Sequence, residues 1–161
     1  MFPDETLDKA ARLIASCEDA GVLIASVESC SGGLIAGCLI SVAGSSAVFE
    51  RGFVTYSNEA KMEVVGVPQQ TLAAHGAVSP ETAIAMADGA LDISPADLSV
   101  GVTGVAGPGG GTPEKPVGTV AIAVARRGRD TVCQMPHFAG DRMAVRLATV
   151  DKALDMMLAA I

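Results

Sequence analysis

The sequence predicts an α/β fold, a three-layer α/β/α sandwich around a parallel or mixed β-sheet, in a single domain over residues 1–161. Short apolar runs of strand length alternate with segments whose apolar residues recur at helical spacing, which is typical of this class. A serine- and glycine-rich turn joins the first apolar run to a helix start. The last two apolar runs are close enough in sequence to form an antiparallel hairpin at one side.

The first half of the chain contains two helix-to-strand alternations. Apolar side chains recur every three or four residues over 7–17, which predicts an amphipathic helix that ends at Gly21. A buried strand is expected at 22–27. A helix over 33–41 then leads, through a short turn, to a second strand at 49–56.

The second half repeats the alternation. A short helix is expected at 58–65, and Ser79 followed by Pro80 marks another helix start, with serine as the N-cap and proline in the first turn. Asp141 is expected to cap the last helix. Three further strands are predicted at residues 98–103, 117–125 and 131–138.

The composition describes a globular, acidic protein. Hydrophobic residues make up 50% of the chain and charged residues 18%, which excludes an intrinsically disordered chain. The net charge of −7 argues against nucleic acid as a partner, because phosphate backbones are bound by clustered Lys and Arg. A small phosphorylated ligand stays compatible with this charge, since it needs only a local site.

Nothing in the sequence predicts a secreted or membrane protein. The first five residues are acidic rather than signal-like, and no apolar run reaches membrane-spanning length. The four cysteines have no C-x-x-C spacing, so neither a zinc site nor a disulfide framework is expected. We expect a cytoplasmic protein without a metal or membrane partner, whose reduced thiols are Cys17, Cys30, Cys38 and Cys133.

The turn at 28–33 is the first candidate for chemistry. It lies between a strand and a helix start, where free backbone N–H groups point at one spot that can hold an anion or an oxyanion. Glu28, Ser29 and Ser31 supply a carboxylate and two hydroxyls beside it, and Gly32 and Gly33 follow. This turn is expected to form one wall of an active site.

Two further segments are unusual. The glycine- and proline-rich stretch 103–119 follows a strand, where ligands bind in open α/β sheets. It contains neither a P-loop nor a dinucleotide-binding G-x-G-x-x-G pattern, so a surface loop is an equally good interpretation. Tyr56 ends a strand and Lys61 follows five residues later. A lysine at the edge of a site can act as a base, although spacing alone favours an exposed lysine.

Together these segments resemble the family of the C-terminal domain of the competence/damage-inducible protein CinA, which includes stand-alone nicotinamide-nucleotide amidases. The resemblance covers nearly the whole chain, in order. It is found at residues 28–33, 44–46, 52–61, 75–79, 103–118 and 140–142. It implies hydrolysis of the carboxamide of nicotinamide mononucleotide to nicotinate mononucleotide and ammonia, without a cofactor or metal, by Ser/Lys chemistry.

The candidate roles follow from what amide hydrolysis needs, namely a nucleophile, a base and an oxyanion hole. Neither His75 nor His137 is placed for a triad, so Lys61 is the expected base. Ser46 is favoured as the nucleophile over Ser29, and the alternative assignment stays open. The resemblance implies that Ser31 is a poor candidate for the nucleophile, since its position is often threonine in that family.

The remaining site residues are expected to bind substrate. Tyr56 would orient Lys61 or donate to the leaving amine, and Arg142 would clamp the 5′-phosphate. Thr103 and the backbone after it would hold the carboxamide or ribose. The other substrate-binding candidates are Glu28, Ser31, Gly32, Gly33, Ser45 and Gly104.

Two other function classes are alternatives for this sequence. A nucleotide-binding regulatory module without turnover would use the same turns but lack an activated serine. A phosphatase or pyrophosphatase is disfavoured, because no carboxylate cluster offers a magnesium site. The expected partners are a small-molecule nucleotide and a second copy of the chain, with a dimer favoured.

Overall fold

The computed structural model describes residues 1–161 and contains one mixed five-stranded sheet of order β2-β1-β3-β4-β5. β1, β2 and β3 run parallel to one another, whereas β4 pairs antiparallel with β3, and β5 antiparallel with β4. The strands are β1 (Ile24–Glu28), β2 (Phe49–Val54), β3 (Leu98–Gly104), β4 (Val120–Arg126) and β5 (Val132–Gln134). The expected hairpin at one edge of the sheet is confirmed.

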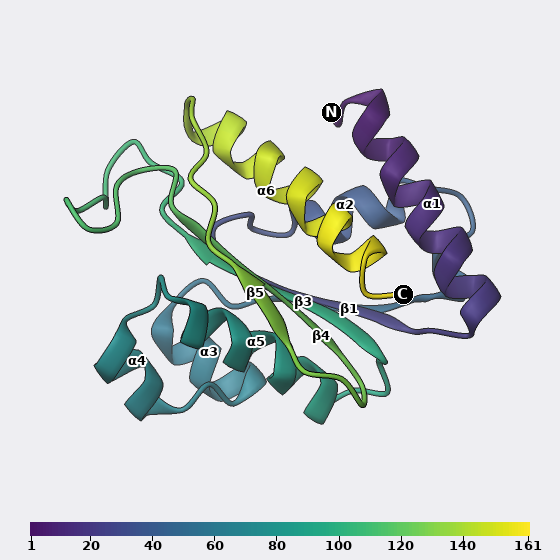
Figure 1. The fold of residues 1–161 in the computed structure, drawn as a ribbon, viewed down its shortest axis with the longest axis horizontal. Helices are drawn as coiled ribbons and strands as arrows, with labels where there is room; N and C mark the ends of the chain where they lie inside the picture. The colour runs from purple at the N-terminus through teal and green to yellow at the C-terminus, as the bar shows by residue number, and fades with distance from the viewer.

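Helices cover both faces of this sheet, so the predicted α/β sandwich is confirmed (Figure 1). On one face lie α1 (Asp4–Ala20), α2 (Leu34–Ile40) and α6 (Arg142–Leu158). On the other lie α3 (Asn58–Val65), α4 (Gln69–His75) and α5 (Pro80–Asp92). A 3₁₀ turn, η1 (Ser45–Ala47), precedes β2. None of the helices is long and apolar enough to cross a membrane.

The two layers of core follow from the alternation of side chains along the strands. In β4, Ile122 and Val124 face α1 and α6, whereas Ala121 and Ala123 face α5. The small residues on the α5 side allow this helix to lie close to the sheet. A Cβ at Gly101 of β3 would come within 2.6 Å of the backbone of α5, so glycine is required there for the helix to lie on the sheet.

The element boundaries differ most from the sequence expectation at the last strand. β5 is only three residues long and is followed by an isolated bridge between Thr119 and His137. Pro136 lacks the N–H group that a continued ladder needs, which shortens the strand expected at 131–138. Helix α4 was not expected, because its seven residues show no clear apolar stripe and leave none buried.

Candidate active site

A cavity of about 300 Å³ opens at the carboxyl ends of the three parallel strands. The order β2-β1-β3 makes the β1–β3 boundary the switch point of the sheet, because the connection after β1 and the connection after β2 leave in opposite directions. Residues from the ends of all three strands and from the start of α6 line this cavity. They include Ser29, Lys61, Tyr56, Thr103, Gly104 and Arg142.

Lys61 lies buried in this cavity against Ser29. Its side chain is 1% exposed, and its Nζ lies 3.1 Å from Ser29 Oγ and 2.9 Å from the carbonyl oxygen of Thr55. Burial lowers the pKa of Lys61, and no carboxylate forms an ion pair with it. The amine is therefore shifted toward the neutral form, which can accept a proton from the hydroxyl.

The start of α3 places this lysine. Ser57 is the N-cap of α3, and its Oγ accepts a hydrogen bond from the N–H of Ala60 at 3.0 Å. Lys61 follows in the first turns of the helix, on the side that faces the end of β1. The N–H of Thr55 donates to the carbonyl of Glu28 at 2.9 Å, which holds the end of β2 beside the end of β1.

Glu28 occupies the anion site that the sequence assigned to a ligand. Its Oε2 accepts from the N–H groups of Gly33 and Ile35, each at 3.0 Å, and its Oε1 accepts from the N–H of Ala36 at 2.8 Å. Ser31 Oγ also donates to this carboxylate at 2.7 Å. The expectation that Gly33 and the helix start bind a phosphate is therefore corrected, because these donors are already taken.

The turn is fixed by these bonds and by α6. Glu28 is 1% exposed and Ser31 is buried, and their side chains, bonded to each other, lie beneath the cavity. Arg146 of α6 donates to the carbonyl of Ser31 at 2.8 Å, and a Cβ at Gly32 would come within 3.3 Å of the same guanidinium. Glu28, Ser31, Gly32 and Gly33 thus shape the turn that presents Ser29.

Two backbone N–H groups of the turn have no oxygen acceptor in the protein. The N–H of Ser29 donates to the carbonyl of Val102, and that of Gly32 donates to the carbonyl of Ser29. The N–H groups of Cys30 and Ser31, which directly follow the serine, donate to no oxygen atom of the protein and lie beside the Cys30 thiol. Adjacent free N–H groups next to a nucleophile are the usual form of an oxyanion hole.

Arg142 closes one side of the cavity. Its Nη1 donates to the carbonyl of Gly107 at 2.7 Å, and its Nη2 donates to the hydroxyl of Tyr56 at 3.0 Å. Tyr56 is 61% exposed and does not contact Lys61 by a hydrogen bond, contrary to the expectation that it orients the lysine. Thr103 Oγ1 donates to the carbonyl of Ala77 at 2.8 Å, at the floor of the cavity.

The structure does not bring Ser46 to Lys61. Ser45 and Ser46 lie in η1, before the amino end of β2, whereas Ser29 follows the carboxyl end of β1. The two strands are parallel, so a strand length of about 17 Å separates the two places at about 3.3 Å per residue. Ser46 is exposed there, so of these two serines it is Ser29 that contacts Lys61.

The histidines and the metal-binding groups lie elsewhere. His75 contacts Glu81 at 3.5 Å, and His137 contacts the carbonyl of Val117 at 2.9 Å. No group of three His, Cys, Asp or Glu side chains is arranged to hold a metal ion. Cys30 and Asn58 also line the cavity. Neither is among the site residues predicted from the sequence, although both lie within motifs that carry the family resemblance.

Known proteins of similar sequence identify the family. A family model described as the CinA C-terminal domain matches residues 6–161. The chain belongs to the CinA C-terminal domain family. The resemblance predicted from the sequence motifs is thus confirmed.

Relatives within this family differ in length. The nicotinamide-nucleotide amidohydrolase PncC of Escherichia coli K12 is 49% identical over 85% of this chain and 83% of its own length. A CinA-like protein of Citrifermentans bemidjiense is 48% identical over 98% of this chain, but that match covers only 38% of the relative. The chain thus spans less than two fifths of the longer CinA-like relatives.

Solved structures agree with the fold. The competence/damage inducible protein CihA from Agrobacterium tumefaciens has a TM-score of 0.96 and 48% identity, covering 99% of this chain and 97% of its own. A CinA superfamily protein from Escherichia coli has a TM-score of 0.93 and 32% identity, covering 100% and 94%. The α/β/α arrangement of this CinA-family chain is therefore shared by its relatives.

Proposed function

We propose that this chain is an amidohydrolase that converts nicotinamide mononucleotide to nicotinate mononucleotide and ammonia. The observation on which the proposal rests is the 3.1 Å contact between Lys61 Nζ and Ser29 Oγ in a buried cavity. The name of the E. coli relative, which states a nicotinamide-nucleotide amidohydrolase, supplies the substrate. A cytoplasmic location and action as one domain over residues 1–161 belong to the same proposal.

The first half-reaction uses the lysine as a base. Serine is a weak nucleophile at neutral pH, so Lys61 takes the hydroxyl proton as Ser29 Oγ attacks the carboxamide carbon. The carbonyl oxygen becomes an oxyanion, which the free N–H groups of Cys30 and Ser31 stabilise. Lys61 then returns its proton to the amide nitrogen, the carbon–nitrogen bond breaks, and ammonia leaves.

The second half-reaction repeats the proton transfers with water. Lys61, again neutral, takes a proton from a water molecule as that water attacks the ester carbon on Ser29. The same N–H groups stabilise the second oxyanion, and the ester bond to Ser29 Oγ breaks as Lys61 returns the proton to it. The lowered pKa of Lys61 supports this role, because a fully charged ammonium has no lone pair to accept a proton.

The charges around the cavity support an anionic nucleotide as substrate. Arg142 is the cation that lines it beside Lys61, and two of its five N–H groups are used by Gly107 and Tyr56. The remaining donors are available to a 5′-phosphate. Thr103 and Gly104, on the β3 side, are proposed to contact the ribose or the carboxamide.

The test is ammonia release from nicotinamide mononucleotide. The wild-type chain should release ammonia and nicotinate mononucleotide in equal amounts. Ser29→Ala should lower kcat by several orders of magnitude while substrate still binds, and the matched control Ser46→Ala should keep near-normal activity. If the wild type binds the nucleotide without hydrolysing it, the chain is the non-catalytic binding module, and the proposal is wrong. We also propose that the chain forms a dimer, and a measurement of the molecular mass of the same sample in solution tests this.

A further inference from the structure

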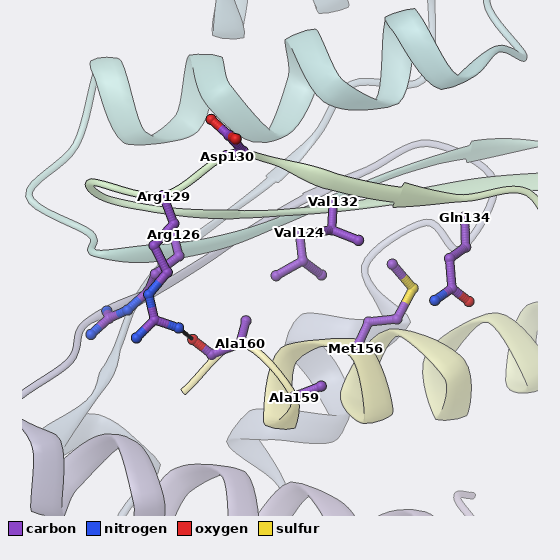
Figure 2. A pocket seen from close by; sticks show the side chains of 9 residues that line it. All are labelled: Val124, Arg126, Arg129, Asp130, Val132, Gln134, Met156, Ala159 and Ala160. Carbon is purple, nitrogen blue, oxygen red and sulfur yellow. Dashed lines mark hydrogen bonds between the residues drawn. The ribbon is translucent and has the colours of Figure 1, made fainter.

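A second cavity, of about 190 Å³, lies between the β4–β5 hairpin and the C-terminal end of α6 (Figure 2). Arg126, which lines it, pairs with Leu98 at the amino end of β3, whereas the active-site cavity opens at the other end, near Gly104. Six residues of strand, at about 3.3 Å each, separate the two levels by about 20 Å. This cavity is therefore a separate place on the molecule.

One end of the cavity is positively charged and short of partners. Arg126 and Arg129 both line the cavity, and Figure 2 shows their side chains at the same end of it. Nη1 of Arg126 is buried and has no hydrogen-bond partner, and Arg129 donates to the carbonyl of Ala160 at 3.0 Å. Neither arginine takes part in an ion pair, and the side chain of Asp130 points away from both.

The other end of the cavity is mainly apolar, and the amide of Gln134 lies at its edge (Figure 2). Val124 and Met156 are almost fully buried, whereas Val132 of the edge strand is 58% exposed. Their side chains lie apart from the two guanidinium groups in Figure 2, so charge and apolar surface are at different ends. An apolar cavity of about 150 Å³ is enough to hold benzene, so this space fits one ring or a branched chain of similar size.

A buried guanidinium N–H without an acceptor is unfavourable, and two like charges near each other add repulsion. Apart from its shielded Nη1, the N–H groups of Arg126 form no hydrogen bond in the protein, so an oxyanion bound by these groups and by Arg129 would neutralise both charges, in the geometry that arginine prefers for carboxylate or phosphate. We propose that this cavity binds a small organic anion. The ligand class is a carboxylate or phosphate ester on a compact apolar group about the size of a phenyl ring.

The experiment is a titration of the ¹⁵N-labelled full chain, followed through its backbone amide resonances. Phenyl phosphate and benzoate are the probes, and the one that binds more tightly identifies the preferred anion. Benzyl alcohol, which has the ring without the charge, and inorganic phosphate, which has the charge without the ring, should each bind much more weakly. Saturable shifts are expected at the amides of Val132, Ala159 and Ala160.

Variants assign the binding to the two arginines. Arg126→Met and Arg129→Met should each weaken the preferred probe at least about tenfold, because each removes a charge-assisted contact. Arg12→Met, which removes an exposed arginine of α1, should leave binding unchanged. All three variants should keep the rate of ammonia release. Measuring both arginine variants protects the test if one of them folds poorly.

The proposal is overturned by any of three results. The first is that the probes shift only active-site amides such as those of Gly104 and Gly107, or show no saturable shift at millimolar concentration. The second is that benzyl alcohol binds as tightly as the anions, which would show that the cavity binds an apolar ring without recognising the charge. The third is that both arginine variants bind the preferred probe as tightly as the wild type does.

Discussion

Glu28→Gln tests whether the carboxylate beneath the active site holds the turn that presents Ser29. The wild-type carboxylate accepts five hydrogen bonds, three of them from backbone N–H groups of the N-cap and first turn of α2. Glutamine has nearly the same shape but brings an NH₂ group, which is a donor, to one of the two oxygen positions. The variant therefore changes hydrogen bonding and charge with little change of volume.

The expected loss in the free energy of unfolding depends on which of the two oxygen positions the NH₂ group takes. At the Oε2 position it would face the N–H groups of Gly33 and Ile35, so two bonds would be lost. At the Oε1 position it faces only the N–H of Ala36, because the hydroxyl of Ser26 can turn to accept. One buried N–H without an acceptor costs about 1–3 kcal/mol, and the other bonds lose charge assistance, so we expect a total of about 3–5 kcal/mol.

Urea unfolding measures this loss. If the dependence of the free energy of unfolding on urea concentration keeps the wild-type slope, the shift in midpoint reports a change in stability. Glu18→Gln, at an exposed position of α1, is the matched control and should change the free energy of unfolding by less than about 0.5 kcal/mol. The hydrolysis rate of Glu28→Gln should fall mainly in kcat, because a displaced turn misplaces Ser29 and the N–H groups beside it. A variant as stable as the control would refute the assignment of Glu28 as the group that holds the turn.

Two further predictions concern the base and the absence of a metal. Lys61→Met should lower hydrolysis at least about a hundredfold and remove the acid limb of the pH–rate profile, since the rate rises with pH as the amine becomes neutral. Because burial lowers the pKa of Lys61 below its ordinary 10.5, the unfolded chain binds more protons. Wild-type stability should therefore rise with pH between the lowered value and 10.5, and Lys61→Met should flatten that rise. A variant with near-normal rate and unchanged acid limb would contradict the Ser/Lys chemistry. EDTA should leave hydrolysis unchanged, and activity that is lost to chelation and restored by one divalent ion would contradict the mechanism.

The sheet and helices could be predicted because local patterns determine them. The apolar run before Glu28, the Ser79–Pro80 helix start and the Asp141 cap each have a short-range physical cause, and the structure contains all three. The sequence could not fix the length of β5. That length depends on how far its partner strand continues and on Pro136, and tertiary pairing rather than local preference decides it.

The candidate site was only partly predictable, because motif residues that are close in sequence need not share an end of a strand. Lys61 and Ser29 meet because β1 and β2 are parallel, which puts their carboxyl ends together. The same parallel pairing carries Ser46, which precedes β2, to the opposite end. The role of Glu28 also differs from the expected substrate binding, because the sequence indicates a helix N-terminus without showing that its own carboxylate folds back onto it.

The role of Arg142 is tested by comparing two substrates, with and without the 5′-phosphate, in the wild type and in a variant. Removing the 5′-phosphate, as in nicotinamide riboside, should cost the wild type at least about 3 kcal/mol in kcat/KM, because a charge-assisted contact is lost. Arg142→Met should reduce that difference to less than about 1 kcal/mol, since the phosphate then has no guanidinium to meet.

The control separates phosphate binding from the bonds that Arg142 makes within the protein. Tyr56→Phe removes the hydroxyl that accepts from Nη2 but leaves the guanidinium anchored on the carbonyl of Gly107. This variant should therefore keep the discrimination between nucleotide and riboside. If Arg142→Met slows both substrates by the same factor, the guanidinium only links the 107 loop to Tyr56. The phosphate must then be held by other groups, because an interaction with the phosphate has to disappear when either the phosphate or its partner is removed.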